Sequence, residues 1–189
     1  MRIGFFALGS LLAVSVNATE ICAPKMNVNQ FTSLLEKTIE QFFPELSKES
    51  IGVSTFRSDA YFLQAQPVVE TLFGNRENRK YNVQLNLRLL ECPPSEESLQ
   101  SILVHELEHI KDYTNWSSGK IAKHGLHYST SLEFRAKYER ATDAKVLEKG
   151  LNSGLAGYRV WVYQWLSPKD LERKRYIYLT PEEILGKSI

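Results

Sequence analysis

The spacing of apolar side chains changes along the chain, and each spacing predicts a type of secondary structure. Alternate residues between positions 81 and 90 are apolar, which is the pattern of a half-buried strand. Residues 51–69 are also expected to be extended, and the polar segment 73–78 predicts a turn between the two. A hairpin or a small antiparallel sheet is therefore expected in the first half of the chain.

Other segments carry apolar residues at helical spacing. They predict helices over residues 27–43, from Ser95 to about Tyr113, from about Ser129 to Lys149, and from Leu151 to Leu166. A polar loop is expected over residues 114–123, and a further helix start at Thr180. Together these elements predict an α+β fold in which the sheet packs on two long helices and the C-terminal half is mostly helical.

The amino-terminal segment has a different pattern, a short positive start followed by an apolar run. Arg2 precedes the uncharged residues 3–16, and Val16 and Ala18 are the apolar and small residues expected before a signal-peptidase cut. We expect residues 1–18 to be a cleaved signal peptide and residues 19–189 to form one domain. The run is shorter than the roughly 20 residues of a spanning helix, so no membrane span is expected after cleavage.

Composition argues against two classes of partner, and the cysteines indicate a compartment. A formal net charge of +1 with mixed signs gives no field that would collect nucleic acid or an anionic membrane surface. The basic run 173–175 is expected to be a solvated face. Export would carry Cys22 and Cys92 into an oxidising compartment, periplasmic or extracellular, where a disulfide between them is expected and two separate thiols are the alternative.

Residues 105–109, His-Glu-Leu-Glu-His, carry the candidate chemistry. On a helix, His105 and His109 lie one turn apart on the same face, so both imidazoles can bind one zinc ion. Glu106 is then free to hold a water molecule at the open position of a catalytic zinc site. Random order would give this pattern with an expectation of about 0.008, which makes chance a poor explanation.

A catalytic zinc site usually has a third protein ligand, which has to come from another part of the chain. Asp112 and Asn115 stand where the longer HExxHxxGxxH pattern of the metzincins has glycine and histidine, so that pattern is excluded. The acid-rich helix predicted downstream offers Glu133 and Glu139. Two downstream histidines, His124 and His127, are the remaining alternatives.

Glu139 and Asp143 lie one helical turn apart, on a face that they share with apolar residues. At this point the chain resembles the gluzincin family of zinc metallopeptidases, in particular the ExxxD type of the prenyl-protein and heat-shock membrane proteases. The resemblance covers about residues 99–150; HExxH is a specific motif, whereas ExxxD alone is not. It implies a zincin-like fold, Glu139 as the third zinc ligand, and Asp143 as the residue that orients a ligand imidazole.

Glu108 departs from these families, which usually carry an uncharged side chain at this position. Its carboxylate either lines the cleft, where it would favour basic substrates, or reaches solvent at the edge of the helix. The second position is the one we expect.

The predicted function is that of a zinc-dependent metallohydrolase, with a peptide or protein as the expected substrate. Glu106 would act as general base, and His127 is favoured as the oxyanion donor over His124, Tyr128 and Tyr113. One alternative, from a different class, is a non-catalytic exported protein in which four protein ligands hold a structural zinc ion. Another keeps the hydrolase but changes the substrate to an amide in cell-wall peptide.

Overall fold

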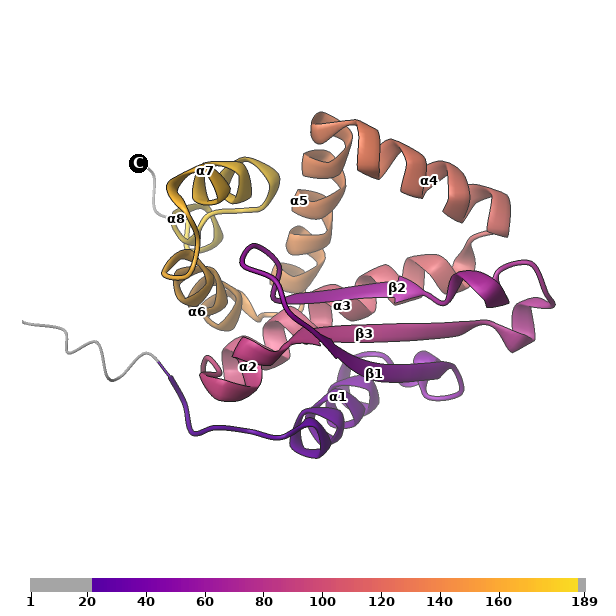
Figure 1. Ribbon diagram of the computed structural model, residues 1–189, viewed down its shortest axis with the longest axis horizontal. Helices are drawn as coiled ribbons and strands as arrows, with labels where there is room; N and C mark the ends of the chain where they lie inside the picture. Colours follow the sequence, from indigo (N-terminus) through magenta and orange to yellow (C-terminus); the bar gives the residue numbers. More distant parts are fainter. Residues whose placement is uncertain (1–21, 187–189) are drawn as a thin grey trace, which may run out of the picture.

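The computed structural model describes residues 22–186, so the predicted signal peptide, residues 1–18, lies outside the described residues (Figure 1). The strands are β1 (Ser50–Phe56), β2 (Leu63–Pro67) and β3 (Lys80–Asn86). The helices are α1 (Val28–Phe42), α2 (Leu87–Glu91), α3 (Glu96–Asn115), α4 (Ser118–Thr130), α5 (Leu132–Glu148), α6 (Asn152–Tyr163), α7 (Pro168–Ile177) and α8 (Pro181–Ile184). The α+β class and the helical C-terminal half are confirmed. Within residues 22–186, no helix has the length and apolar character needed to cross a membrane.

The sheet is mixed, because its central strand pairs in opposite senses with its two neighbours. β3 lies parallel to β1 and antiparallel to β2, and Val83 of β3 is level with Val53 and Ala65. The prediction of a purely antiparallel sheet is therefore wrong for β1, which is parallel to β3. β2 and β3 do form an antiparallel pair, but residues 51–69 make two strands on opposite sides of β3. Alternation along one strand does not determine which edge of the sheet a neighbouring strand joins.

Helix α3 lies at the centre of the molecule, with its N-terminus where the sequence predicts it. The Ser95 hydroxyl accepts a hydrogen bond from the backbone N–H of Ser98 and caps the helix. α3 contacts β2 on one side and α1, α5 and α6 on the others (Figure 1). Helix α6 comes especially close, since a Cβ atom added at Gly154 would lie 2.1 Å from Ser101 Oγ. Because it is covered on several sides, α3 can hold polar side chains away from water.

Two predicted segments differ from the structure near α3. Residues 87–90, predicted to be extended, form helix α2, because the Asn86 side chain accepts a hydrogen bond from Arg88 N and starts a helical turn. The predicted loop 114–123 is largely replaced by helix α4, which Ser117 caps through Lys120 N. α4 buries only Ile121, so its apolar pattern is too weak to reveal a helix.

The predicted disulfide between Cys22 and Cys92 is present, with the two Cα atoms 4.8 Å apart. It joins the segment before α1 to the segment before α3. Two backbone hydrogen bonds reinforce the same junction, from Ala23 N to Pro93 O at 2.8 Å and from Met26 N to Leu90 O at 3.1 Å. The described N-terminal segment is thereby fixed beside the start of α3.

Candidate metal centre

Helices α3 and α5 bring His105, His109 and Glu139 together in the protein interior. His105 Nε2 lies 2.9 Å from Glu139 Oε2 and 3.1 Å from His109 Nε2, and the last two atoms are 3.3 Å apart. All three side chains are buried. Metal–ligand bonds of roughly 2.0–2.2 Å in tetrahedral geometry separate neighbouring ligand atoms by about 3.3–3.6 Å. The cluster therefore needs only a small expansion to hold a metal ion.

The pattern of buried residues on α5 explains why Glu139 faces inward. The residues of α5 that are buried recur at spacings of three and four: Ala136, Glu139, Thr142, Asp143 and Val146. This stripe packs against α3, so both acids are carried into the interior on an otherwise apolar face. Glu139 and Asp143 both reach His105 of α3 from this face.

Asp143 determines which nitrogen of His105 faces the cluster. Its Oδ1 lies 2.9 Å from His105 Nδ1 and accepts a hydrogen bond from Arg159 Nη2 at 2.7 Å, while Oδ2 accepts from Leu179 N at 2.9 Å. Because a carboxylate only accepts, Nδ1 of His105 carries a proton. Nε2 then faces Glu139 and His109, and it can bind a metal ion once it gives up the proton that it shares with Glu139.

Tyr138 does the same for His109. Its hydroxyl donates to Asp112 Oδ2 at 3.0 Å and lies 3.1 Å from His109 Nδ1. Since its single proton is used on Asp112, the Tyr138 oxygen accepts from Nδ1–H of His109, and the Nε2 lone pair of His109 also faces the cluster. Sequence reasoning missed Tyr138 and Asp112, because neither belongs to a recognised spacing.

Tyr128 completes the set by holding Glu139. Its hydroxyl donates to Oε1 of Glu139, which leaves Oε2 directed at the two histidines. Each of the three ligand residues is therefore held in place by a contact to one of its polar atoms. Its other polar atom faces the centre of the cluster. This arrangement fits a divalent cation, because the ion would take the place of the proton between His105 and Glu139 and would be bound by all three atoms.

The charges of the cluster favour a cation at its centre. Burial by itself would raise the pKa of Glu139, but His109 and His105 hold it well below its usual range. Burial likewise lowers the pKa of His105, yet Asp143 and Glu139 outweigh it and raise the pKa to about 10. The buried carboxylates thus attract positive charge, either a proton on His105 or a bound metal ion.

Glu106 is buried beside the cluster but takes no part in it. No cationic side-chain atom of residues 22–186 lies within 4.0 Å of its carboxylate. Burial is the main cause that raises its pKa. A carboxyl group whose pKa is raised in this way binds and releases a proton more readily near neutral pH than an exposed glutamate does. It is also the acid of α3 that borders the adjoining cavity.

A cavity of about 560 Å³, here called the metal-side cavity, opens beside the cluster. β2 forms one wall, and residues of α4 and α5 form the other. Its polar lining includes His105, Glu106, His109, Tyr113, His124, Tyr128, Arg135, Tyr138, Glu139 and Tyr178. The candidate ligands therefore border a space large enough for a small peptide segment.

The other candidate residues lie elsewhere. His127 is exposed, packs edge-on against Phe134 at 5.4 Å between ring centroids, and does not line the metal-side cavity. Its position gives no support to the predicted oxyanion role. His124 lines the cavity but packs against Tyr138 at 4.3 Å, and Glu133 is exposed at the start of α5. None of the three belongs to the ligand cluster.

Glu108 is neither in the cavity nor in solvent, so the expected position at the helix edge is wrong. Its side chain is buried between α3 and α5, where Oε2 lies 3.5 Å from Lys145 Nζ and Oε1 lies 3.4 Å from Lys149 Nζ. The unusual carboxylate is neutralised by α5 on the face of α3 that points away from the cavity. It therefore supports helix packing and leaves the metal cluster untouched.

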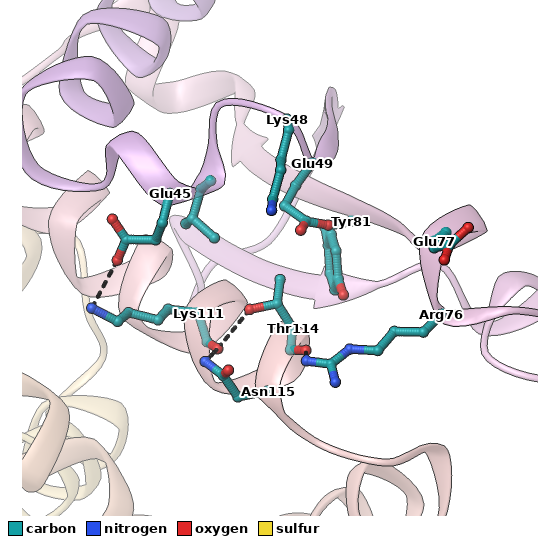
Figure 2. Close-up of a pocket in the computed structure, with 10 residues that line it drawn as sticks. Glu45, Lys48, Glu49, Arg76, Glu77, Tyr81, Lys111, Thr114 and Asn115 are labelled. Atoms are coloured by element: carbon teal, nitrogen blue, oxygen red, sulfur yellow. Dashed lines mark hydrogen bonds and ion pairs between the residues drawn. The ribbon is translucent and has the colours of Figure 1, made fainter.

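A second hollow, of about 530 Å³, lies at the C-terminal end of α3 and is here called the charged hollow (Figure 2). Its lining residues are Glu45, Leu46, Lys48, Glu49, Arg76, Glu77, Tyr81, Lys111, Thr114 and Asn115. Lys111 Nζ pairs with Glu45 Oε1 at 2.8 Å, and Arg76 donates to the carbonyl oxygen of Thr114. Lys111 and Arg76 are therefore both satisfied by acceptor groups of the chain itself.

Comparison of the chain with protein-family models, with curated proteins and with solved structures gave no match. The grounds for a function are therefore the positions, burial and charges of the residues in the metal-side cavity. These positions are specific enough to support one chemistry over another.

Proposed function

We propose that the protein is a zinc-dependent metallohydrolase that cleaves peptide bonds. The observation that carries the proposal is the convergence of three buried ligand atoms beside Glu106, at the wall of an open cavity. Two imidazole nitrogens and one carboxylate oxygen are a donor set of catalytic zinc sites. Zinc bound there would supply Lewis-acid activation of water and substrate.

The residues around the cluster have distinct tasks in this proposal. Glu106 takes a proton from the attacking water and later delivers it to the leaving nitrogen, for which its raised pKa suits it. Asp143 and Tyr128 hold His105 and Glu139 in their orientations. Tyr178, whose ring lies 6.0 Å from that of His105, lines the cavity and is the proposed oxyanion donor.

The edge of the sheet supports a peptide as the substrate. β2 pairs with β3 on one side, whereas along its other side residues Leu63–Pro67 line the metal-side cavity. An edge strand offers unpaired backbone N–H and C=O groups, to which an extended peptide can add as a further strand. Such a peptide would lie across the mouth of the metal cluster.

A purely structural metal is less well supported. A structural zinc site is closed by four protein ligands, but the cluster contains three, and both His124 and His127 lie outside it. The combination of HExxH on α3 with a glutamate from the following long helix also supports the gluzincin assignment and a zincin-like fold. The disulfide supports export to an oxidising compartment.

Metal analysis combined with a peptide-library assay tests the proposal, using wild type, Glu106→Gln and Glu108→Gln. Glu108 is the matched control, because it is a buried glutamate on the same helix that faces away from the cavity. All three proteins are expected to hold one zinc ion per chain. Loss of the general base is expected to lower the rate of hydrolysis by roughly 10²–10⁴-fold, and Glu108→Gln to retain activity per folded molecule. The proposal is wrong if zinc-loaded wild type cleaves nothing, or if Glu106→Gln cleaves equally well.

A further inference from the structure

Lys174 is the residue of the basic run 173–175 that turns into the protein. Arg173 and Arg175 are exposed, as expected of a solvated face, but Lys174 is partly buried. Its Nζ atom lies 4.7 Å from the ring centroid of Tyr61 and 4.9 Å from that of Tyr178. Both rings line the metal-side cavity, so the ammonium group stands directly behind its wall.

Lys174 lines two smaller cavities beside the proposed active site. One, of about 20 Å³, is lined by Lys174 together with His105 and Glu106. The other, of about 80 Å³, is lined by Lys174 together with Arg135 and Tyr128. Arg135 also lines the metal-side cavity. Two cationic side chains from different helices, α5 and α7, therefore meet at one end of the proposed active site.

These cations have no counter-ion in the described part of the chain. No carboxylate oxygen of residues 22–186 lies within 4.0 Å of Lys174 Nζ or of the Arg135 guanidinium. Asp170 is the nearest acid in the wall of the second small cavity, and it accepts a hydrogen bond from Ser167 at 2.6 Å. Arg135 donates from Nε and Nη2 to the carbonyl of Tyr128, so Nη1 has no partner among these residues.

Three other acids near the site already have partners within the chain. Asp143 faces Arg159, Arg140 pairs with Glu183, and Glu139 lies against the two histidines. Partial burial, followed by repulsion from Arg159, lowers the pKa of Lys174 to about 8, so it remains mostly protonated at neutral pH. The rings of Tyr61 and Tyr178 stabilise the ammonium group through cation–π contacts, but they bring no negative charge, so Lys174 can still bind an anion from outside the chain.

We propose that Lys174 and Arg135 form a carboxylate-binding subsite, so that the substrate carries a carboxylate close to the scissile bond. The inference rests on the proposed hydrolase function and names the class of peptide that it acts on. An ammonium group and a guanidinium that converge on one cavity are matched to a carboxylate, because charge-assisted hydrogen bonds are about twice as strong as neutral ones. Either the C-terminal carboxylate of a peptide or an acidic side chain supplies this group.

A binding experiment on the zinc-loaded Glu106→Gln protein tests the subsite without turnover. The probes are three fluorescein-labelled hexapeptide pools: free acids without Asp or Glu, the same pool as C-terminal amides, and amides with one fixed Glu. We expect the amide pool to bind about 10-fold more weakly than at least one of the carboxylate pools. A preference for the free acids identifies the terminal carboxylate, and a preference for the Glu pool identifies a side chain.

The variant Lys174→Met, combined with Glu106→Gln, is expected to remove the preference. Lys169→Met is the matched control, because Lys169 is an exposed lysine on the same helix, and it is expected to retain the preference. Lys174→Arg keeps the charge and is expected to retain most of the preference, which distinguishes a lost charge from a misfolded protein. Equal binding of all three pools would overturn the inference, and so would a preference that survives in Lys174→Met, since the carboxylate would then be held by the metal.

Turnover and binding separate this inference from the proposed function. If wild type hydrolyses no peptide but the Lys174-dependent preference is observed, the hydrolase proposal fails and the subsite stands. If wild type cleaves free acids, amides and Glu-containing amides with equal kcat/KM, the subsite fails and the hydrolase proposal stands. Loss of the preference in Lys174→Met is expected to raise KM for carboxylate substrates and leave kcat nearly unchanged.

Discussion

The metal-side cavity and the charged hollow have similar volumes, about 560 and 530 Å³, and both include residues of helix α3. They differ in how their charges are satisfied. In the charged hollow, Lys111 and Glu45 form an ion pair whose side chains are 40% and 48% exposed. In the metal-side cavity, His105 and Glu139 are buried, and their remaining lone pairs converge on one point.

This comparison shows that size does not distinguish a candidate site from an ordinary surface hollow. Exposed ion pairs are stabilised by water and require no ligand. Buried ligand atoms that converge on one point and share a single proton can exchange that proton for an ion of higher charge, and a divalent cation is the simplest such partner. Each prediction below tests whether the two hollows differ in this way.

The largest difference between the two hollows is expected in zinc affinity, when one metal ligand is removed. Glu139→Gln replaces a charged ligand oxygen by an amide, so the affinity for zinc should fall by more than the roughly 10–100-fold that loss of a supporting residue causes. Glu45→Gln is the matched change in the charged hollow and should leave zinc affinity unaltered. Competition titration with a zinc chelator measures both. Equal zinc affinities in the two variants would contradict the assignment of the metal centre.

A smaller effect on zinc is expected for Asp143→Asn, which leaves all three ligands in place. The amide no longer holds His105 Nδ1–H as strongly, so zinc affinity should fall by roughly 10–100-fold. Arg159 would also lose its buried counter-ion, with a loss of about 3–5 kcal/mol in the free energy of unfolding. Chelator competition and urea unfolding report the two effects separately. Unchanged zinc affinity would exclude an orienting role for Asp143.

The free energy of unfolding of the metal-free protein should fall at low pH, and part of this fall should come from Asp143 beside the cluster. Burial would raise the pKa of Asp143, but Arg159 holds it below 3.8 in the folded protein. The charged carboxylate therefore stabilises the folded state above that pH, and the contribution is lost as the pH falls through the lower folded value. Urea unfolding between pH 2 and 5 should show a steeper loss in wild type than in Asp143→Asn, because Glu139 contributes to the loss in both proteins and Asp143 only in wild type. Parallel profiles for the two proteins would contradict it.

The smallest effect is expected in the charged hollow. Lys111→Met removes the ion pair with Glu45, and because both side chains are well exposed the free energy of unfolding should change by at most about 1 kcal/mol. Zinc content and peptide hydrolysis should not change. Thermal unfolding and the peptide-library assay check these points, and a large loss of activity would mean that the charged hollow also takes part in the chemistry.

Local sequence determined the features that involve residues within one helical turn of each other, namely helix caps and shared helix faces. Ser95 and Thr180 cap helices where the sequence predicts them, because a capping side chain reaches backbone groups two or three residues away. His105 and His109 had to share a face of α3 for the same reason. Glu139 was assigned from its resemblance to a known motif, and the structure brings it to both histidines.

Only the tertiary structure decided how the cluster is held and which of its neighbours matter. No sequence spacing selects Tyr138, Tyr128 and Arg159, which support the ligands. The sequence also predicts that Lys174 is part of a solvated basic run, whereas the packing of α7 places it beside the cavity. Likewise, the side of β3 on which β1 pairs depends on how the chain crosses the sheet. Periodicity reports which face of an element is buried, whereas the partners on that face are brought together only by packing between segments far apart in the chain.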